Sequence, residues 1–125
     1  MIFLTLDQLL RLHALSIHRY GGSTGVRDVG RLEAVLATQA QEVFGEELYP
    51  TLGQKAAVMM RNIIADHPFV DGNKRTAYVL MRLILKENQL DIIVGQSEKY
   101  EFVIKAAKGQ LTFDNIKGWI EKNIK

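Results

Sequence analysis

The chain has 125 residues, of which 47% are hydrophobic and 24% are charged, and it contains no cysteine. This length fits one globular domain with its own apolar core, and the lack of cysteine excludes thiol catalysis, cysteine-ligated zinc and disulfides. A formal net charge of +2 without a basic stripe argues against direct nucleic-acid binding. No basic segment precedes the first apolar residues, and no apolar run is long enough to span a membrane. We therefore expect a cytoplasmic protein with one domain over residues 1–125.

The first part of the chain predicts two helices joined by a glycine-rich loop. Thr5 and Gln8 form a capping box that opens a helix ending at about residue 19. The Gly-Gly-Ser-Thr-Gly run at 21–25 predicts a flexible loop. Asp28 is the expected cap of a second helix, which ends before Gly45.

The middle of the chain predicts two apolar helices on either side of a polar loop. The first covers about residues 52–65, and Pro68 disfavours helical backbone angles at the preceding His67. The second runs from about Asn73 to Glu87 and is apolar over most of its surface. Such a helix is typically buried at the centre of a fold.

The last part of the chain predicts two shorter helices, at about 98–108 and 113–123. Ser97 and Thr112 are their expected caps, and Gly109 separates them. The run from Asp91 to Val94 is the only strand candidate, and one short strand does not form a sheet. The sequence therefore predicts an all-α fold, a compact bundle of about six helices.

The loop between the two apolar helices concentrates polar, charged and glycine residues. It reads His67-Pro68-Phe69-Val70-Asp71-Gly72-Asn73-Lys74-Arg75. The N–H groups that open the following helix lack intrahelical acceptors, and the helix dipole makes that end positive. Gly72 lets a ligand approach the backbone, while Lys74 and Arg75 add two positive charges. These features predict an anion site, and a phosphate chain is the anion that they favour.

Asp71 and His67 add two further chemical functions to this loop. A carboxylate beside phosphates is a common Mg²⁺ ligand, and His67 is the one group here that exchanges a proton near neutral pH. Each residue also has a plainer interpretation: Asp71 as a helix cap, Lys74 as a solvated side chain, and His67 as a packed one. A single phosphate-binding site explains all of these residues together and replaces several separate explanations. Phe69 is expected to pin the loop to the core.

Two other motif interpretations fail on the residues present. A P-loop requires glycine where Asn73 and Pro68 stand, and a preceding strand that is absent. His67 and Asp71 are spaced as zinc ligands are, but no further ligand set accompanies them. His13 and His18 lie on the first helix, where we expect them to pack or to be exposed.

The loop resembles the signature of the Fic/Doc family, His-x-Phe-x-Asp/Glu-Gly/Ala-Asn-Gly/Lys-Arg. AMP-transferring Fic proteins have a glycine at the position of Lys74 and a second arginine at the position of Tyr78. The residues found here resemble the Doc branch, which comprises toxins of toxin–antitoxin pairs. A segment near the amino terminus is also similar to that of Doc toxins: Arg19-Tyr20-Gly21-Gly22, then Gly25, Asp28, Gly30 and Glu33.

The resemblance implies a Fic/Doc-type helical bundle that uses ATP and Mg²⁺. Fic proteins transfer AMP to a target hydroxyl, whereas Doc transfers the γ-phosphate to a threonine of elongation factor Tu. By this analogy His67 is the general base and Asp71 holds Mg²⁺. The phosphates are then bound by Gly72, Asn73, Lys74 and Arg75. The resemblance also implies a partner, the Phd-type antitoxin that neutralises Doc toxins. Inhibition within the chain is not expected, because Val43 follows Thr38 and Glu42 where the inhibitory motif of Fic proteins has glycine or asparagine.

Three alternatives to a γ-phosphate-transferring toxin remain at this point. One is an AMP transferase, which Lys74 in place of glycine disfavours. Another is a non-catalytic module for anions or peptides, which has no need of a base such as His67. The third is an inhibitor that binds the ribosome or RNA, which the small net charge disfavours.

Overall fold

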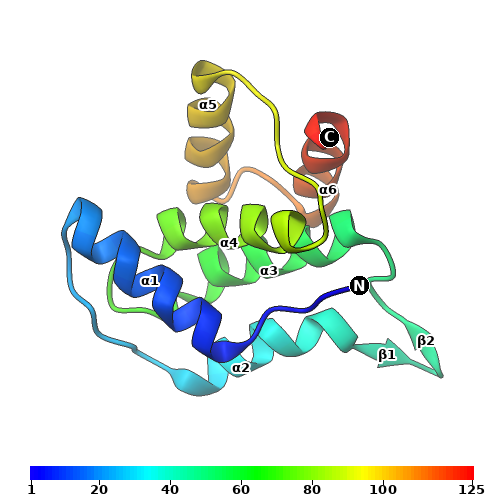
Figure 1. Cartoon of the computed structure of the whole chain (residues 1–125), viewed down its shortest axis with the longest axis horizontal. Coiled ribbons are helices and arrows are strands. Elements are labelled where there is room, and N and C mark those ends of the chain that lie inside the picture. The colour runs from blue at the N-terminus through cyan, green and yellow to red at the C-terminus, as the bar shows by residue number, and fades with distance from the viewer.

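The computed structural model describes residues 1–125 and consists of six α-helices with a minimal hairpin (Figure 1). The helices are α1 (Leu6–Tyr20), α2 (Val29–Ala37), α3 (Leu52–Asp66), α4 (Asn73–Glu87), α5 (Gln96–Ala107) and α6 (Phe113–Asn123). A short 3₁₀ turn, η1 (Thr38–Ala40), follows α2, and the strands β1 (Glu42–Val43) and β2 (Glu46–Glu47) pair antiparallel. The predicted all-α fold with about six helices is confirmed.

Side-chain caps define three of the helix starts as the sequence predicts. Thr5 and Gln8 form a reciprocal capping box at α1, and Thr112 heads a second one at α6. The Asp28 carboxylate accepts the Arg31 N–H at the start of α2, at 3.1 Å. Each cap satisfies an N–H group that has no partner within its helix, so the local sequence is sufficient to fix these boundaries.

The other caps and the strand candidate need correction. Helix α5 begins at Gln96 after Gly95, without a side-chain cap, so Ser97 lies inside the first turn. The strand candidate at 91–94 contributes only an isolated bridge between Ile92 and Ile124. Gly45 belongs to the hairpin turn and has φ of 80°, so it does not end α2.

Helices α3 and α4 lie side by side at the centre of the molecule, as Figure 1 shows. Helices α1 and α2 cover one side of this pair, and α5 and α6 cover the other. Between them, α3 and α4 supply most of the fully buried apolar side chains, which confirms that the fourth predicted helix is central. Because the two helices are joined by a short loop, the end of α3 and the start of α4 form a rigid base for residues 67–72.

The far end of α4 is tied to the carboxyl-terminal segment. Arg82 donates two hydrogen bonds to the Asp91 carboxylate, at 3.0 and 2.9 Å. Those hydrogen bonds lower the pKa of Asp91 below its ordinary value, and they raise the pKa of Arg82. The Asp91 backbone in turn pairs with Lys125 through two hydrogen bonds.

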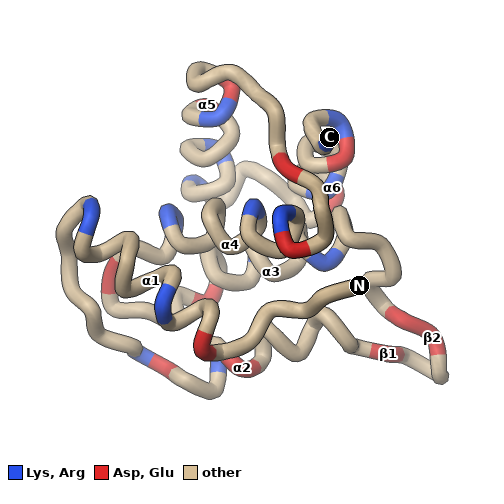
Figure 2. The backbone as a smooth tube through the Cα atoms, in the orientation of Figure 1, with Lys and Arg blue, Asp and Glu red and all other residues tan.

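The charged residues are mixed over the surface. Figure 2 shows Lys and Arg interspersed with Asp and Glu along the helices. In this view the Lys and Arg positions form no continuous run along the backbone. None of the six helices has the length and apolarity needed to cross a membrane.

Candidate functional site

His67 ends α3 in a left-handed conformation, with φ of 47° and ψ of 58°. Its N–H bonds to the Ile63 carbonyl at 3.1 Å, which closes the last turn. Such a conformation costs a non-glycine residue about 1–3 kcal/mol, and strain of this kind is concentrated at functional sites. The sequence prediction that Pro68 forces His67 out of helical angles is confirmed. The imidazole is exposed and lines a cleft.

Phe69 and Asn73 hold the loop against the core. The Phe69 ring is fully buried, as predicted. The Asn73 side chain accepts the Phe69 N–H at 3.0 Å and donates to the Phe69 carbonyl at 2.9 Å. Both polar ends of the Asn73 amide are therefore used within the loop, which leaves its backbone N–H as the group available to a phosphate.

The amino terminus of α4 is open. Gly72 is its N-cap residue, with φ of 76°, and no side chain caps the helix. The first backbone bond of the helix joins the Thr76 N–H to the Gly72 carbonyl at 3.0 Å, so the N–H groups of residues 73–75 precede the helical ladder. The interpretation of Asp71 as the helix cap is wrong. Free N–H groups at this end attract an anion.

Asp71 is held by contacts from two other parts of the chain. Its carboxylate accepts the Gly72 N–H at 2.8 Å and the Ser23 N–H at 3.3 Å. Its carbonyl lies 2.8 Å from Nε2 of His13. Because a carbonyl oxygen only accepts, this contact places a proton on Nε2 of His13. A carboxylate has about four acceptor positions, so Asp71 keeps capacity for a cation.

His13 contacts the loop from α1, a role that the sequence did not indicate. It is 2% exposed, and its ring stacks on Phe69 with centroids 3.7 Å apart and planes 5° apart. Its position on the apolar face of α1 was the only available signal, since its partners lie 56 and 58 residues away. His18 on the same helix is exposed.

The glycine-rich segment after α1 braces the loop. Gly25 accepts the Val70 N–H at 2.9 Å, and the Pro68 carbonyl accepts the N–H groups of Arg27 and Asp28 at 2.8 and 3.1 Å. The predicted flexible loop at 21–25 is therefore held at its end, because Gly25 and the residues that follow it form backbone hydrogen bonds with residues 68 and 70. Glycine is favoured at position 22 because its φ is 114° and because a Cβ there would lie 2.6 Å from Oδ2 of Asp71, which would have to move.

A cleft of about 920 Å³ runs along this loop and the first turns of α4. The end of α1 and one face of α5 form its other walls. Every residue that the sequence proposes for the site lines this cleft: His67, Asp71, Gly72, Asn73, Lys74 and Arg75. The Arg75 guanidinium lies 4.4 Å from the centre of the Tyr20 ring, a cation–π distance. The structure therefore brings the predicted cations, the carboxylate and the histidine together.

Tyr78 lines the same cleft one helical turn after Lys74. Its side chain is 4% exposed, and burial raises the pKa of its phenol. The phenol therefore stays neutral at physiological pH, so Tyr78 is not a second base. His67 is therefore the candidate proton acceptor in the cleft.

The donor set of the cleft suits a magnesium ion that arrives with phosphates. Asp71 is the single carboxylate among the lining residues, and no group of three histidine, aspartate or glutamate side chains could hold a metal alone. Mg²⁺ commonly binds one or two carboxylates together with phosphate oxygens and water. The residues present fit that pattern.

These features define a helical protein whose cleft combines a positive helix end, an acidic side chain and an exposed histidine, an arrangement suited to an anion. The Fic/DOC family model matches residues 3–85, and the chain belongs to this family. It is 38% identical over 73 residues to the "Toxin Doc" of Mycolicibacterium smegmatis, an alignment that covers 58% of this chain and 56% of that protein. It is 31% identical over 110 residues to the "Protein kinase doc" of Escherichia phage P1, covering 88% of this chain and 86% of that protein.

Proposed function

We propose that this chain is the toxin of a toxin–antitoxin pair and acts in the cytoplasm as a Mg²⁺-dependent protein kinase. It transfers the γ-phosphate of ATP to a serine or threonine hydroxyl of a translation factor such as elongation factor Tu, and translation stops. The observation that carries the proposal is the meeting of His67, Asp71 and the open end of α4 in one cleft. The names of the two relatives, a toxin and a protein kinase, support it.

The proposed reaction assigns a step to each group. The target hydroxyl gives its proton to His67 while its oxygen forms a bond to the γ-phosphorus, and the bond to the β–γ bridging oxygen breaks to release ADP. The N–H groups of residues 73–75, with Lys74 and Arg75, stabilise the phosphate charge. Asp71 would hold Mg²⁺, which neutralises phosphate charge when it is bound.

The proposed toxin needs a protein that neutralises it. A Phd-type antitoxin is the proposed neutralising protein, since the sequence lacks an internal inhibitory motif. An inhibitor that acts by binding RNA is disfavoured because the formal net charge is only +2 and basic positions alternate with acidic ones along the backbone (Figure 2).

The test uses ATP labelled at either the α- or the γ-phosphate, with elongation factor Tu as acceptor. We expect γ-label on the acceptor, and we expect His67→Ala to lower its rate by about 10²–10⁴ without changing the melting temperature or the nucleotide affinity. His18→Ala, an exposed histidine outside the cleft, is the matched control. Transfer of α-label would identify an AMP transferase instead, and transfer of neither label would refute catalysis on this acceptor.

A further inference from the structure

We propose that Lys99 of α5 binds the nucleotide phosphate that lies farthest from the reacting one. This inference rests on the proposed function, because it assumes that a nucleotide occupies the cleft. Lys99 could not be assigned a role from the sequence, since it lies 24 residues beyond the end of the loop motif.

Lys99 lies in the wall of the cleft that α5 forms. It lines the cleft together with Tyr100 and Val103 of the same helix, across from the loop. Its Nζ lies 5.1 Å from the centre of the Tyr78 ring. The side chain is half-buried, and no carboxylate lies within ion-pairing distance of it. The ring contact leaves the ammonium hydrogens available to an anion.

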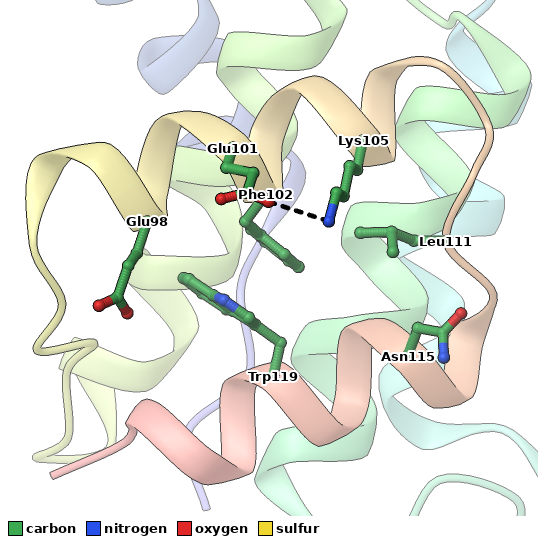
Figure 3. Close-up of a pocket in the computed structure, with 7 residues that line it drawn as sticks. All are labelled: Glu98, Glu101, Phe102, Lys105, Leu111, Asn115 and Trp119. Atoms are coloured by element: carbon green, nitrogen blue, oxygen red, sulfur yellow. Dashed lines mark ion pairs between the residues drawn. The ribbon is translucent and has the colours of Figure 1, made fainter.

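The charges of α5 are divided between two faces. Its glutamates Glu98 and Glu101 line a separate groove toward α6, as Figure 3 shows, and Glu101 pairs with Lys105 at 3.0 Å. Phe102 stacks on Trp119 in that groove, with ring centroids 3.7 Å apart, which fixes the rotation of α5 about its axis. Lys99 therefore faces the cleft as an unneutralised charge.

Helix α4 provides no cation at the position that Lys99 covers. Tyr78 follows Lys74 by one turn on the same face, about 5.4 Å along the axis. The next basic residue of α4 is Arg82, and its guanidinium is bound to the Asp91 carboxylate. Lys99 reaches over the Tyr78 ring from α5 and extends the positive lining of the cleft by one turn.

The order of the groups along the cleft decides which phosphate Lys99 binds. The reacting phosphate must lie at the loop, beside His67 and Asp71. Phosphates bound at the open end of α4 lie next, and Lys99 lies a turn beyond them. In γ-phosphate transfer the group at Lys99 is the α-phosphate, which ADP also carries. In AMP transfer the group at Lys99 is the γ-phosphate, which ADP lacks.

The experiment measures the Kd of ATP and of ADP, each with Mg²⁺, by calorimetry in the absence of a protein acceptor. Lys99→Met keeps the apolar stem and removes the charge, so we expect it to raise the Kd of both nucleotides about tenfold. Lys99→Arg keeps the charge and should stay within about threefold of the wild type. Lys108→Met changes an exposed lysine at the carboxyl-terminal cap of α5, outside the cleft, and should leave both constants unchanged. Melting temperatures check that each variant is folded.

Three other results would contradict the proposed role of Lys99, the nucleotide orientation or the proposed function. If Lys99→Met binds ATP and ADP like the wild type, Lys99 is not a phosphate ligand. If only ATP binding weakens, Lys99 is a ligand but the nucleotide has the orientation of AMP transfer. If the wild type binds neither nucleotide, the proposed function and this inference both fail.

Discussion

Replacing His13 by phenylalanine separates the hydrogen bond of this residue from its packing. A phenyl ring retains the stack on Phe69, which His13 makes at a centroid distance of 3.7 Å. The substitution removes the Nε2 donor that lies 2.8 Å from the Asp71 carbonyl. Asp71 would then lose the contact that fixes its backbone from the side of α1.

The structure sets the size of the expected effect. Leaving a buried carbonyl without a donor costs about 1–3 kcal/mol, and this contact is only partly buried, so we expect about 1 kcal/mol of lost stability. The effect on transfer should be larger than the effect on stability. A displaced Asp71 misplaces both its carboxylate and the start of α4, and small misplacements of this kind cost up to about 10²-fold in rate.

The assay compares the single-turnover transfer rate with the Kd of ATP. We expect His13→Phe to lower the rate 10- to 100-fold, with a smaller change in Kd, and His13→Gln, which restores a donor, to recover part of the loss. His18→Phe on the same helix is the control, because His18 is exposed. A His13→Phe variant that transfers phosphate within twofold of the wild type would show that the contact from α1 does not position the loop.

Three further predictions follow from other contacts. Lys74→Gly should reduce γ-phosphate transfer and allow some AMP transfer, whereas Lys74→Met should lose γ-phosphate transfer without gaining AMP transfer. Transfer of γ-phosphate at the wild-type rate by both variants would show that Lys74 is a surface residue. Gly22→Ala should weaken transfer and raise the Mg²⁺ requirement, because its Cβ would lie 2.6 Å from Oδ2 of Asp71, whereas Gly21→Ala meets no atom within 4 Å. Asp91→Asn should cost about 1 kcal/mol at pH 6, measured by urea unfolding. Because the pKa of Asp91 is lowered from its ordinary 3.8, its stabilisation is fully present above that value and is lost as the pH falls through the folded-state pKa, so the cost should vanish in acid below the folded-state pKa.

The sequence predicts those parts of the fold that local chemistry decides. The cap at Thr5 and the backbone angles at His67 depend on residues within four positions, and both are confirmed. The run at 91–94 depends instead on distant partners. Asp91 and Ile93 bond to the backbone of the carboxyl-terminal segment, which gives one bridge and no strand. Nothing within the run itself determines that outcome.

The same division applies to the candidate site. The loop residues from His67 to Arg75 are contiguous, so their chemistry can be read from the sequence as one motif. Gly22 and Lys99 reach the cleft, and His13 reaches the back of the loop, only through the packing of the segment after α1, of α5 and of α1. Helical periodicity places His13 on an apolar face, but it does not indicate which carbonyl that face meets.

The hydrogen bonds of the loop explain why residues so far from its motif should control its chemistry. The backbone of residues 68–71 is engaged at every position: Pro68 by Arg27 and Asp28, Phe69 by Asn73, Val70 by Gly25, and Asp71 by His13. With the backbone fixed from the inside, the His67 imidazole and the open end of α4 face the cleft without rearrangement. Groups that are already oriented stabilise a transition state at the lowest cost in reorganisation. Weakening any of these braces should therefore lower the transfer rate more than it lowers nucleotide affinity, which distinguishes them from Lys99, whose loss should act on affinity.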